Sequence, residues 1–153
     1  MQHHVSFPYD GISLYLTGQV RRRYPVVLTW HGHEFEIALT GRAFAVTGDL
    51  SVARLERPTS GRSILPSIDE ASRTTAIYDL RTTIDDALEV DGIGHQLIQN
   101  TFWGEYSLMI PATAIQVGPA FRDRAPRHLA ASTVTRILAA VSARCPVDFV
   151  SAP

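Results

Sequence analysis

Residues 25–39 read Pro-Val-Val-Leu-Thr-Trp-His-Gly-His-Glu-Phe-Glu-Ile-Ala-Leu. β-Branched and aromatic residues fill both halves of this stretch, and His31-Gly32 separates the halves. The pattern is typical of two antiparallel strands, residues 25–30 and 33–39, joined by a two-residue hairpin loop. In that register the alternating glutamates face water, and the core side is formed by Phe35, Ile37 and Leu39.

Short runs of the same kind continue on both sides of this hairpin. They predict further strands at residues 12–17, 42–46 and 50–56. The turns between them fall at three Thr-Gly pairs, which are Thr17-Gly18, Thr40-Gly41 and Thr47-Gly48. We therefore expect the first third of the chain to form an antiparallel meander of about five strands.

The composition changes at residues 58–67, where Pro, Ser and Gly predict an internal loop. The elements expected beyond this loop are a strand at 74–80, a short helix at 83–90, a second short helix at 95–103, and strands at 105–110 and 114–117. Asp85 and Asp86 would then lie in the first turn of a helix, where the helix dipole favours negative charge.

The clearest helix is predicted at residues 127–143, where Leu129, Thr133 and Ile137 recur at helical spacing. A last edge strand is expected at residues 147–150. The fold class that follows is α+β, with residues 1–153 as a single domain. A mostly antiparallel β-sheet is expected to carry the long C-terminal helix packed on one face.

The length and composition fit one ordinary globular domain, with 153 residues, 45% of them apolar and 19% charged. No run approaches the roughly 20 apolar residues of a membrane-spanning helix. The first ten residues lack the pattern of a signal peptide. Because Cys145 is the single cysteine, no internal disulfide can form. These features predict a cytoplasmic protein that does not bind membranes.

Negative charge is concentrated in the middle of the chain. The whole chain has a net charge of −1, but residues 63–110 carry two arginines against eight carboxylates, a net charge of −6. Large aromatic residues with a potential for exposure, Tyr78, Trp103 and Tyr106, accompany them. Negative charge attracts a basic partner, and aromatic side chains anchor an interface after contact.

This pattern predicts a non-enzymatic protein-binding module, such as an immunity-type inhibitor of a basic nuclease toxin. The expected partner-binding residues are Asp79, Asp85, Asp86, Glu89, Asp91, Trp103 and Glu105. No Gly-x-Ser-x-Gly motif supplies a hydrolase nucleophile, and spacing assigns no base to Cys145. Residues 1–62 have a net charge of only +2, which argues against nucleic acid as the partner.

The alternative hypothesis is a small metal-binding or ligand-binding β-rich protein or enzyme. His31 and His33 are two residues apart, a spacing that places both imidazoles on one face of a strand, and Glu36 or Glu34 could add a carboxylate. The cofactor would be a divalent metal ion. If His31 lies in a hairpin turn instead, the two histidines no longer share a face.

The same segment resembles the first motif of the cupin family. That motif begins His-x-His, as in His31-Gly32-His33, and Glu34 is followed here by six residues and Gly41. The resemblance implies a β-barrel with a metal ion bound by these side chains. The chain departs from the motif because no spacer separates His33 from Glu34. It also departs because no second-motif histidine follows Pro111.

Overall fold

The computed structural model describes residues 7–18, 23–119, 121 and 129–144, and it confirms the α+β class. Its strands are β1 (Ser13–Leu16), β2 (Tyr24–Trp30), β3 (His33–Leu39), β4 (Arg62–Ser63), β5 (Ile98–Phe102), β6 (Glu105–Leu108) and β7 (Ile115–Val117). Its α-helices are α1 (Gly41–Glu56), α2 (Arg73–Leu88), α3 (Ile93–Leu97) and α5 (Ala131–Arg144). Two short 3-10 turns are η1 (Glu70–Ser72) and η2 (Ala112–Ala114).

The strands form two sheets. In the four-stranded sheet the order is β3-β2-β1-β7, with β1 antiparallel to β2 and parallel to β7. The three-stranded sheet is antiparallel, in the order β4-β6-β5. The predicted hairpin is confirmed, because Trp30 pairs with His33 around a turn in which His31 and Gly32 have φ of 52° and 77°. Positive φ at both turn residues is the geometry that two-residue hairpins favour.

The predicted strands at 42–46 and 50–56 are wrong, because both segments belong to α1. Residues 43–55 of this helix are all buried. A helix buried on every side has no polar face, so its sequence shows no helical periodicity and resembles a series of buried strands. The five-strand meander is therefore reduced to β1, β2 and β3.

Two of the predicted Thr-Gly turns have other roles in α1. The Oγ1 atom of Thr40 accepts a hydrogen bond from the Ala43 amide (3.2 Å), so Thr40 is the N-cap of the helix. Gly48 lies in the helix interior, where a Cβ atom would stand 2.6 Å from Leu129 Cδ1. Leu129 therefore packs directly against the helix backbone at this glycine, and a larger residue here would have to displace the Leu129 side chain.

A second correction concerns residues 74–103. The predicted strand at 74–80 and the predicted helix at 83–90 are one continuous helix, α2, whose buried residues are Ala76, Ile77, Leu80, Ile84 and Leu88. The helix predicted at 95–103 is the short α3 followed directly by strand β5. Asp85 and Asp86 consequently lie in the last turn of α2, at the pole where the helix dipole disfavours negative charge.

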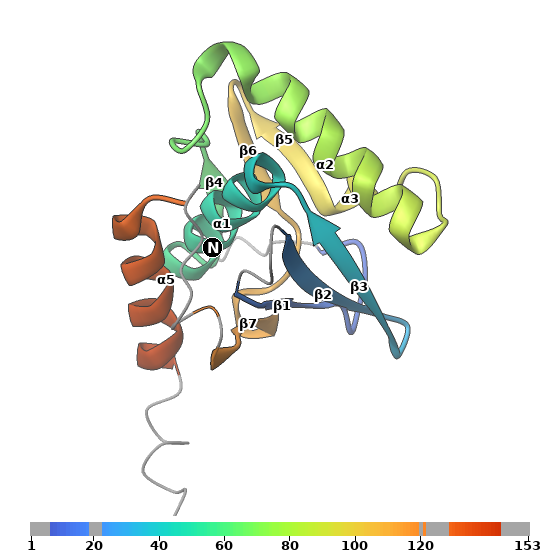
Figure 1. Cartoon of the computed structure of the whole chain (residues 1–153), viewed down its shortest axis with the longest axis horizontal. Helices are drawn as coiled ribbons and strands as arrows, with labels where there is room; N and C mark the ends of the chain where they lie inside the picture. Colours follow the sequence, from blue (N-terminus) through green and yellow to red (C-terminus); the bar gives the residue numbers. More distant parts are fainter. Residues whose placement is uncertain (1–6, 19–22, 120, 122–128, 145–153) are drawn as a thin grey trace, which may run out of the picture.

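Helix α1 lies at the centre of the fold, between the two sheets, with α2 and α5 on its flanks (Figure 1). The C-terminal helix α5 packs against α1 and reaches the sheet at β7, and its buried side chains include Val134 and Ile137. One cluster of buried apolar side chains runs through both sheets. The N-terminal part of the predicted helix and the strand predicted at 147–150 lie outside the described residues.

Residues 58–67 form turns and irregular chain apart from the short strand β4, and a buried arginine organises this segment. Arg54 on α1 is fully buried; its Nε donates to the Leu108 carbonyl (3.0 Å) and its Nη1 to the Pro58 carbonyl (2.8 Å). The Phe7 ring lies 5.2 Å from the guanidinium carbon. Burial lowers the pKa of this guanidinium. These contacts hold the loop against α1.

The cupin-like arrangement is not found. Gly41, which would close the first cupin motif, begins helix α1, and the four-stranded sheet is open at β3 and β7. Across the described ranges, no helix is long and apolar enough to cross a membrane.

Candidate protein-interaction surface

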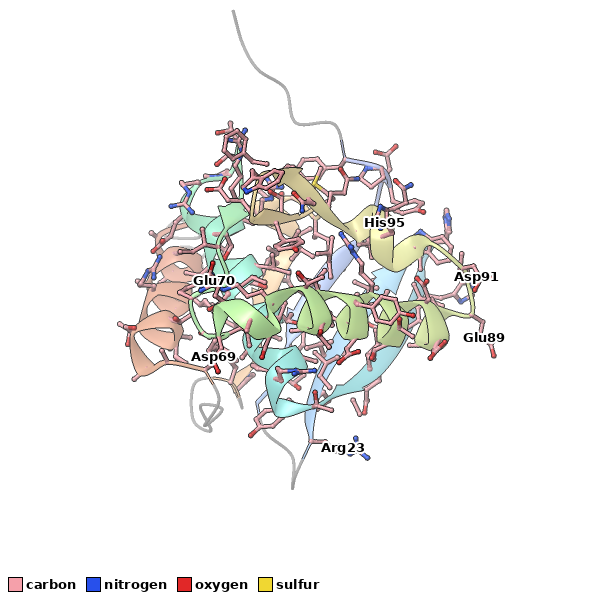
Figure 2. The ribbon with its side chains drawn as sticks, turned by 90° about the horizontal axis from the view of Figure 1, so that it is seen from above. Arg23, Asp69, Glu70, Glu89, Asp91 and His95 are labelled. Carbon is pink, nitrogen blue, oxygen red and sulfur yellow. The ribbon has the colours of Figure 1, made fainter. Side chains whose placement is uncertain are left out.

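The exposed face of α2 and the neighbouring β5–β6 hairpin carry the residues expected to bind a partner. Figure 2 shows Asp69 and Glu70 at the beginning of α2, and Glu89 and Asp91 at its far end, with His95 on the adjacent α3. The structure sorts the predicted acidic residues into two kinds. Some have internal partners and support the fold, whereas others face solvent without a partner in the part of the chain that the structure describes.

Asp85 supports the fold. Its two carboxylate oxygens accept hydrogen bonds from the backbone amides of Gly92 (3.0 Å) and Gly94 (2.6 Å). This fastens the turn between α2 and α3. A Cβ atom at Gly94 would stand 2.3 Å from the Arg81 carbonyl oxygen, so the two helices meet at backbone distance there. Asp85 is therefore a structural residue of the turn.

Asp79 also has an internal partner. The Nη2 atom of Arg42 lies 2.7 Å from its Oδ2 atom, and both side chains are about half exposed. Ion pairs of this exposed kind contribute about 0–1 kcal/mol to stability. The pair nevertheless neutralises the Asp79 charge, so this residue adds little to the negative potential of the surface.

The remaining acids form what we call the acidic end of α2: Asp86, Glu89 and Asp91. All three are exposed, and none forms a side-chain hydrogen bond or ion pair with any residue that the structure describes. The last turn of α2 has no basic residue. Glu89 follows the helix as its C-cap with φ of 58°, in the left-handed region that glycine and asparagine favour.

The second patch is the tip of the β5–β6 hairpin, which we call the aromatic tip: Phe102 and Trp103. The turn runs from Phe102 to Glu105, which pair across it, and Gly104 has φ of 71°. The Trp103 side chain is 94% exposed and that of Phe102 58%. The guanidinium carbon of Arg62 lies 5.1 Å from the Phe102 ring centre. Of the three aromatic residues expected at the surface, Tyr78 is exposed, whereas Tyr106 is buried.

An open groove between α2 and β5 runs from the aromatic tip to His95 on α3. The hollow beside the aromatic tip and the hollow beside His95 share Thr74, Asn100 and Tyr106 in their linings, so they are continuous. Thr74 lies in the first turn of α2 and Asp86 twelve residues later, about 18 Å along the helix axis at ~1.5 Å per residue. The acidic end and the aromatic tip therefore lie near opposite ends of α2, and the groove extends from the tip as far as His95.

Arg81 is a residue of this groove that the sequence analysis missed. It donates through Nε to the Ile98 carbonyl (2.9 Å), and burial lowers its pKa. The Ile98 amide donates to the Gly94 carbonyl. The N–H and C=O groups of Ile98, at the start of β5, thus both have partners inside the chain. The only signal in the sequence was an arginine isolated within an acidic segment.

The structure does not place His31, His33 and Glu36 on one face of β3. His31 lies in the hairpin turn with its ring 4.3 Å from that of Trp30. His33 and Glu36 are three residues apart on β3, so their side chains point to opposite faces of the sheet, and Glu34 shares the face of Glu36. Within the described ranges, no three His, Cys, Asp or Glu side chains are grouped closely enough to bind a metal ion.

Asp49 is a buried acid that lies inside the fold on α1. Its carboxylate accepts hydrogen bonds from the Ser67 amide (2.8 Å) and hydroxyl (2.7 Å). Burial raises the pKa of Asp49, against the opposing influence of these hydrogen bonds and of Arg136 and Arg73. The contacts fasten the chain before α2 onto α1, so we interpret Asp49 as structural.

Comparisons of the chain with models of protein families, with characterised proteins and with solved structures give no match. A function for this surface must therefore be argued from its residues.

Proposed function

We propose that this chain is a non-enzymatic protein-binding module, and that the acidic end of α2 binds a basic polypeptide. The observation that carries the proposal is the placement of Asp86, Glu89 and Asp91. All three are exposed and without a partner among the described residues, at the helix pole where negative charge is unfavourable.

The placement of these acids opposes stability. A negative charge at a helix C-terminus is unfavourable by about 0.3–1 kcal/mol, and a side chain in left-handed backbone adds about 1 kcal/mol. Glu89 has both properties. Strained or electrostatically unfavourable residues concentrate at functional sites. A basic partner would remove the repulsion on binding, so part of the unfavourable energy in the free chain would return as affinity.

The partner class follows from the charge. An acidic patch accelerates association with a cationic surface and excludes anionic partners such as nucleic acid. An immunity-type inhibitor that covers a cationic nuclease toxin has the size of this chain and the charge of residues 63–110, which is −6. Asp79 and Asp85, which have internal partners, are not part of the proposed contact.

The test compares two variants with the same change in charge. In Asp86→Asn/Glu89→Asn the acidic end loses two charges, and in Asp69→Asn/Glu70→Gln the opposite end of α2 loses two. Each is used to capture partners from cells that produce the chain, and the complexes are weighed by native mass spectrometry. We expect a 1:1 complex with a basic polypeptide for wild type and for the control, and at least tenfold less for the first variant.

A loss of capture would not be caused by unfolding of the variant. Asp86→Asn/Glu89→Asn removes unfavourable charges, so it is expected to be at least as stable as wild type. Equal capture by the two variants, or capture of an acidic partner, would contradict the proposed function.

A further inference from the structure

The aromatic tip has one ring that is used within the chain and one that is not. The Phe102 ring holds the guanidinium of Arg62 at 5.1 Å. Trp103, the next residue, is 94% exposed and forms no ring contact or cation contact with a described residue. Tryptophan is the best of the aromatic side chains for holding a cation over its face. The tip therefore has an arginine–phenylalanine contact and, beside it, a tryptophan ring that contacts no described residue in this way and that binds cations more strongly than phenylalanine.

The backbone below the free ring is joined by hydrogen-bonding groups. The Asn100 side chain lies beside the carbonyl oxygens of Phe102 and Glu105, and with its amide nitrogen turned toward them it would donate to both ends of the turn. A hydrogen bond of 2.9 Å between the hydroxyls of Thr101 and Ser107 joins the strands below. Because the turn is already ordered, a partner that binds Trp103 loses little conformational entropy.

The surroundings of Trp103 suit a guanidinium better than an alkyl chain. The hollow beside the ring includes the polar side chains of Thr74, Asn100 and Thr101. Glu105, the last residue of the turn, is partly exposed, and its carboxylate has no partner among the residues described. An arginine stacks its planar guanidinium on an aromatic face while its N–H groups donate to a carboxylate, whereas a lysine ammonium is a compact point charge.

We infer that the aromatic tip is an arginine-binding site, in which an arginine of the basic partner stacks on Trp103 and pairs with Glu105. The inference rests on the proposed function and extends it. The acidic end attracts lysine and arginine alike, because it acts through charge alone. The tip adds a preference for arginine near the other end of α2.

The test uses two synthetic peptides of about twelve residues, one alternating glycine with arginine and the other glycine with lysine. Binding to the full chain is followed by fluorescence anisotropy of the labelled peptides. We expect the arginine peptide to bind about fivefold more tightly than the lysine peptide, within the range of one cation–π contact. In Trp103→Leu and in Glu105→Gln this preference should disappear, and Trp103→Phe should retain part of it.

The same peptides separate this inference from the proposed function. Asp86→Asn/Glu89→Asn should weaken both peptides equally and leave their ratio unchanged. Equal binding of the two peptides by wild type, no binding of either, or an unchanged preference in Trp103→Leu would overturn the arginine site. If wild type binds the two peptides equally and Asp86→Asn/Glu89→Asn binds both more weakly, the arginine site is excluded but the proposed function is retained. Because the Trp103 side chain is 94% exposed, Trp103→Leu should melt at the temperature of wild type.

Discussion

Helices α1 and α2 have the same length, sixteen residues each, but they use their charged side chains in opposite ways. In α1, Asp49 and Arg54 are buried; Asp49 bonds to Ser67, and Arg54 bonds to the carbonyls of Pro58 and of Leu108 in β6. In α2, Asp86 is exposed without a partner among the described residues, and Glu89 continues this pattern at the C-cap.

The contrast shows where this chain uses polar groups for folding and where it leaves them available for binding. Removing a satisfied buried group exposes its former partners to desolvation, so it should destabilise the fold. Removing a group that faces water in an unfavourable field should stabilise the fold. Opposite signs are therefore expected from changes at the buried charges of α1 and at the exposed acidic end of α2.

The largest effect should come from Arg54→Met. The Leu108 and Pro58 carbonyls would lose their donors, and we expect the free energy of unfolding to fall by about 3 kcal/mol. Urea unfolding measures the loss. The matched control is Arg57→Met, because the Arg57 side chain is exposed and donates to the Arg62 carbonyl. If the two variants lose the same stability, the buried arginine does not hold the loop.

The contrast can be sharpened within α2 by changing two acids four residues apart. Asp85→Ala should lower the free energy of unfolding by about 1–2 kcal/mol, because the amides of Gly92 and Gly94 lose their acceptor. Glu89→Asn should raise it by about 0.5–1 kcal/mol, because asparagine tolerates left-handed backbone and carries no charge. Thermal unfolding separates the two, and a destabilised Glu89→Asn would remove the physical argument for the acidic end.

The smallest effect concerns the exposed end of α1, where Arg136 of α5 donates through Nε (2.9 Å) and Nη2 to the two carboxylate oxygens of Glu56. The hydrogen bond from Arg136 lowers the pKa of Glu56 below its ordinary value. Such a pair stabilises the fold above the unfolded-state pKa of about 4.3, and the contribution is lost as the pH falls through the lower folded-state pKa.

Glu56→Gln should therefore cost less than about 1 kcal/mol at pH 7 and nothing at a pH below both values. Urea unfolding of both proteins across this pH range gives the difference. A constant difference at every pH would show that the ion pair is not its cause.

The sequence predicted the elements that have one buried face and one solvent-exposed face. β3 alternates between buried and exposed side chains, and α5 has a single buried stripe, so their periodicity was visible. Residues 43–55 of α1 are buried on all sides, so their sequence has no helical periodicity and predicts strands instead. The β-branched residues Thr74, Thr75 and Ile77 concealed the first half of α2, although Ile77, Leu80 and Ile84 have helical spacing.

The candidate site was predictable in composition but not in arrangement. The acidic segment and Trp103 were identified from sequence because charge and aromatic content need no geometry. The partners of Asp79 and Asp85 depend on folding, since Arg42 is 37 residues from Asp79 and Gly94 is nine residues from Asp85. The division of one acidic segment into supporting and available carboxylates therefore required the structure.

The bond from Arg81 to the Ile98 carbonyl has a consequence for solubility. An open sheet edge presents unpaired N–H and C=O groups to which a strand of another molecule can pair. An exposed tryptophan at the end of that edge would strengthen such an association. Arg81 and the Gly94 carbonyl occupy the peptide groups at the start of β5, which shortens the open edge. Trp103 thus remains accessible to a partner, while other copies of the chain find fewer free main-chain groups on which to pair a strand. This limits self-aggregation at high concentration.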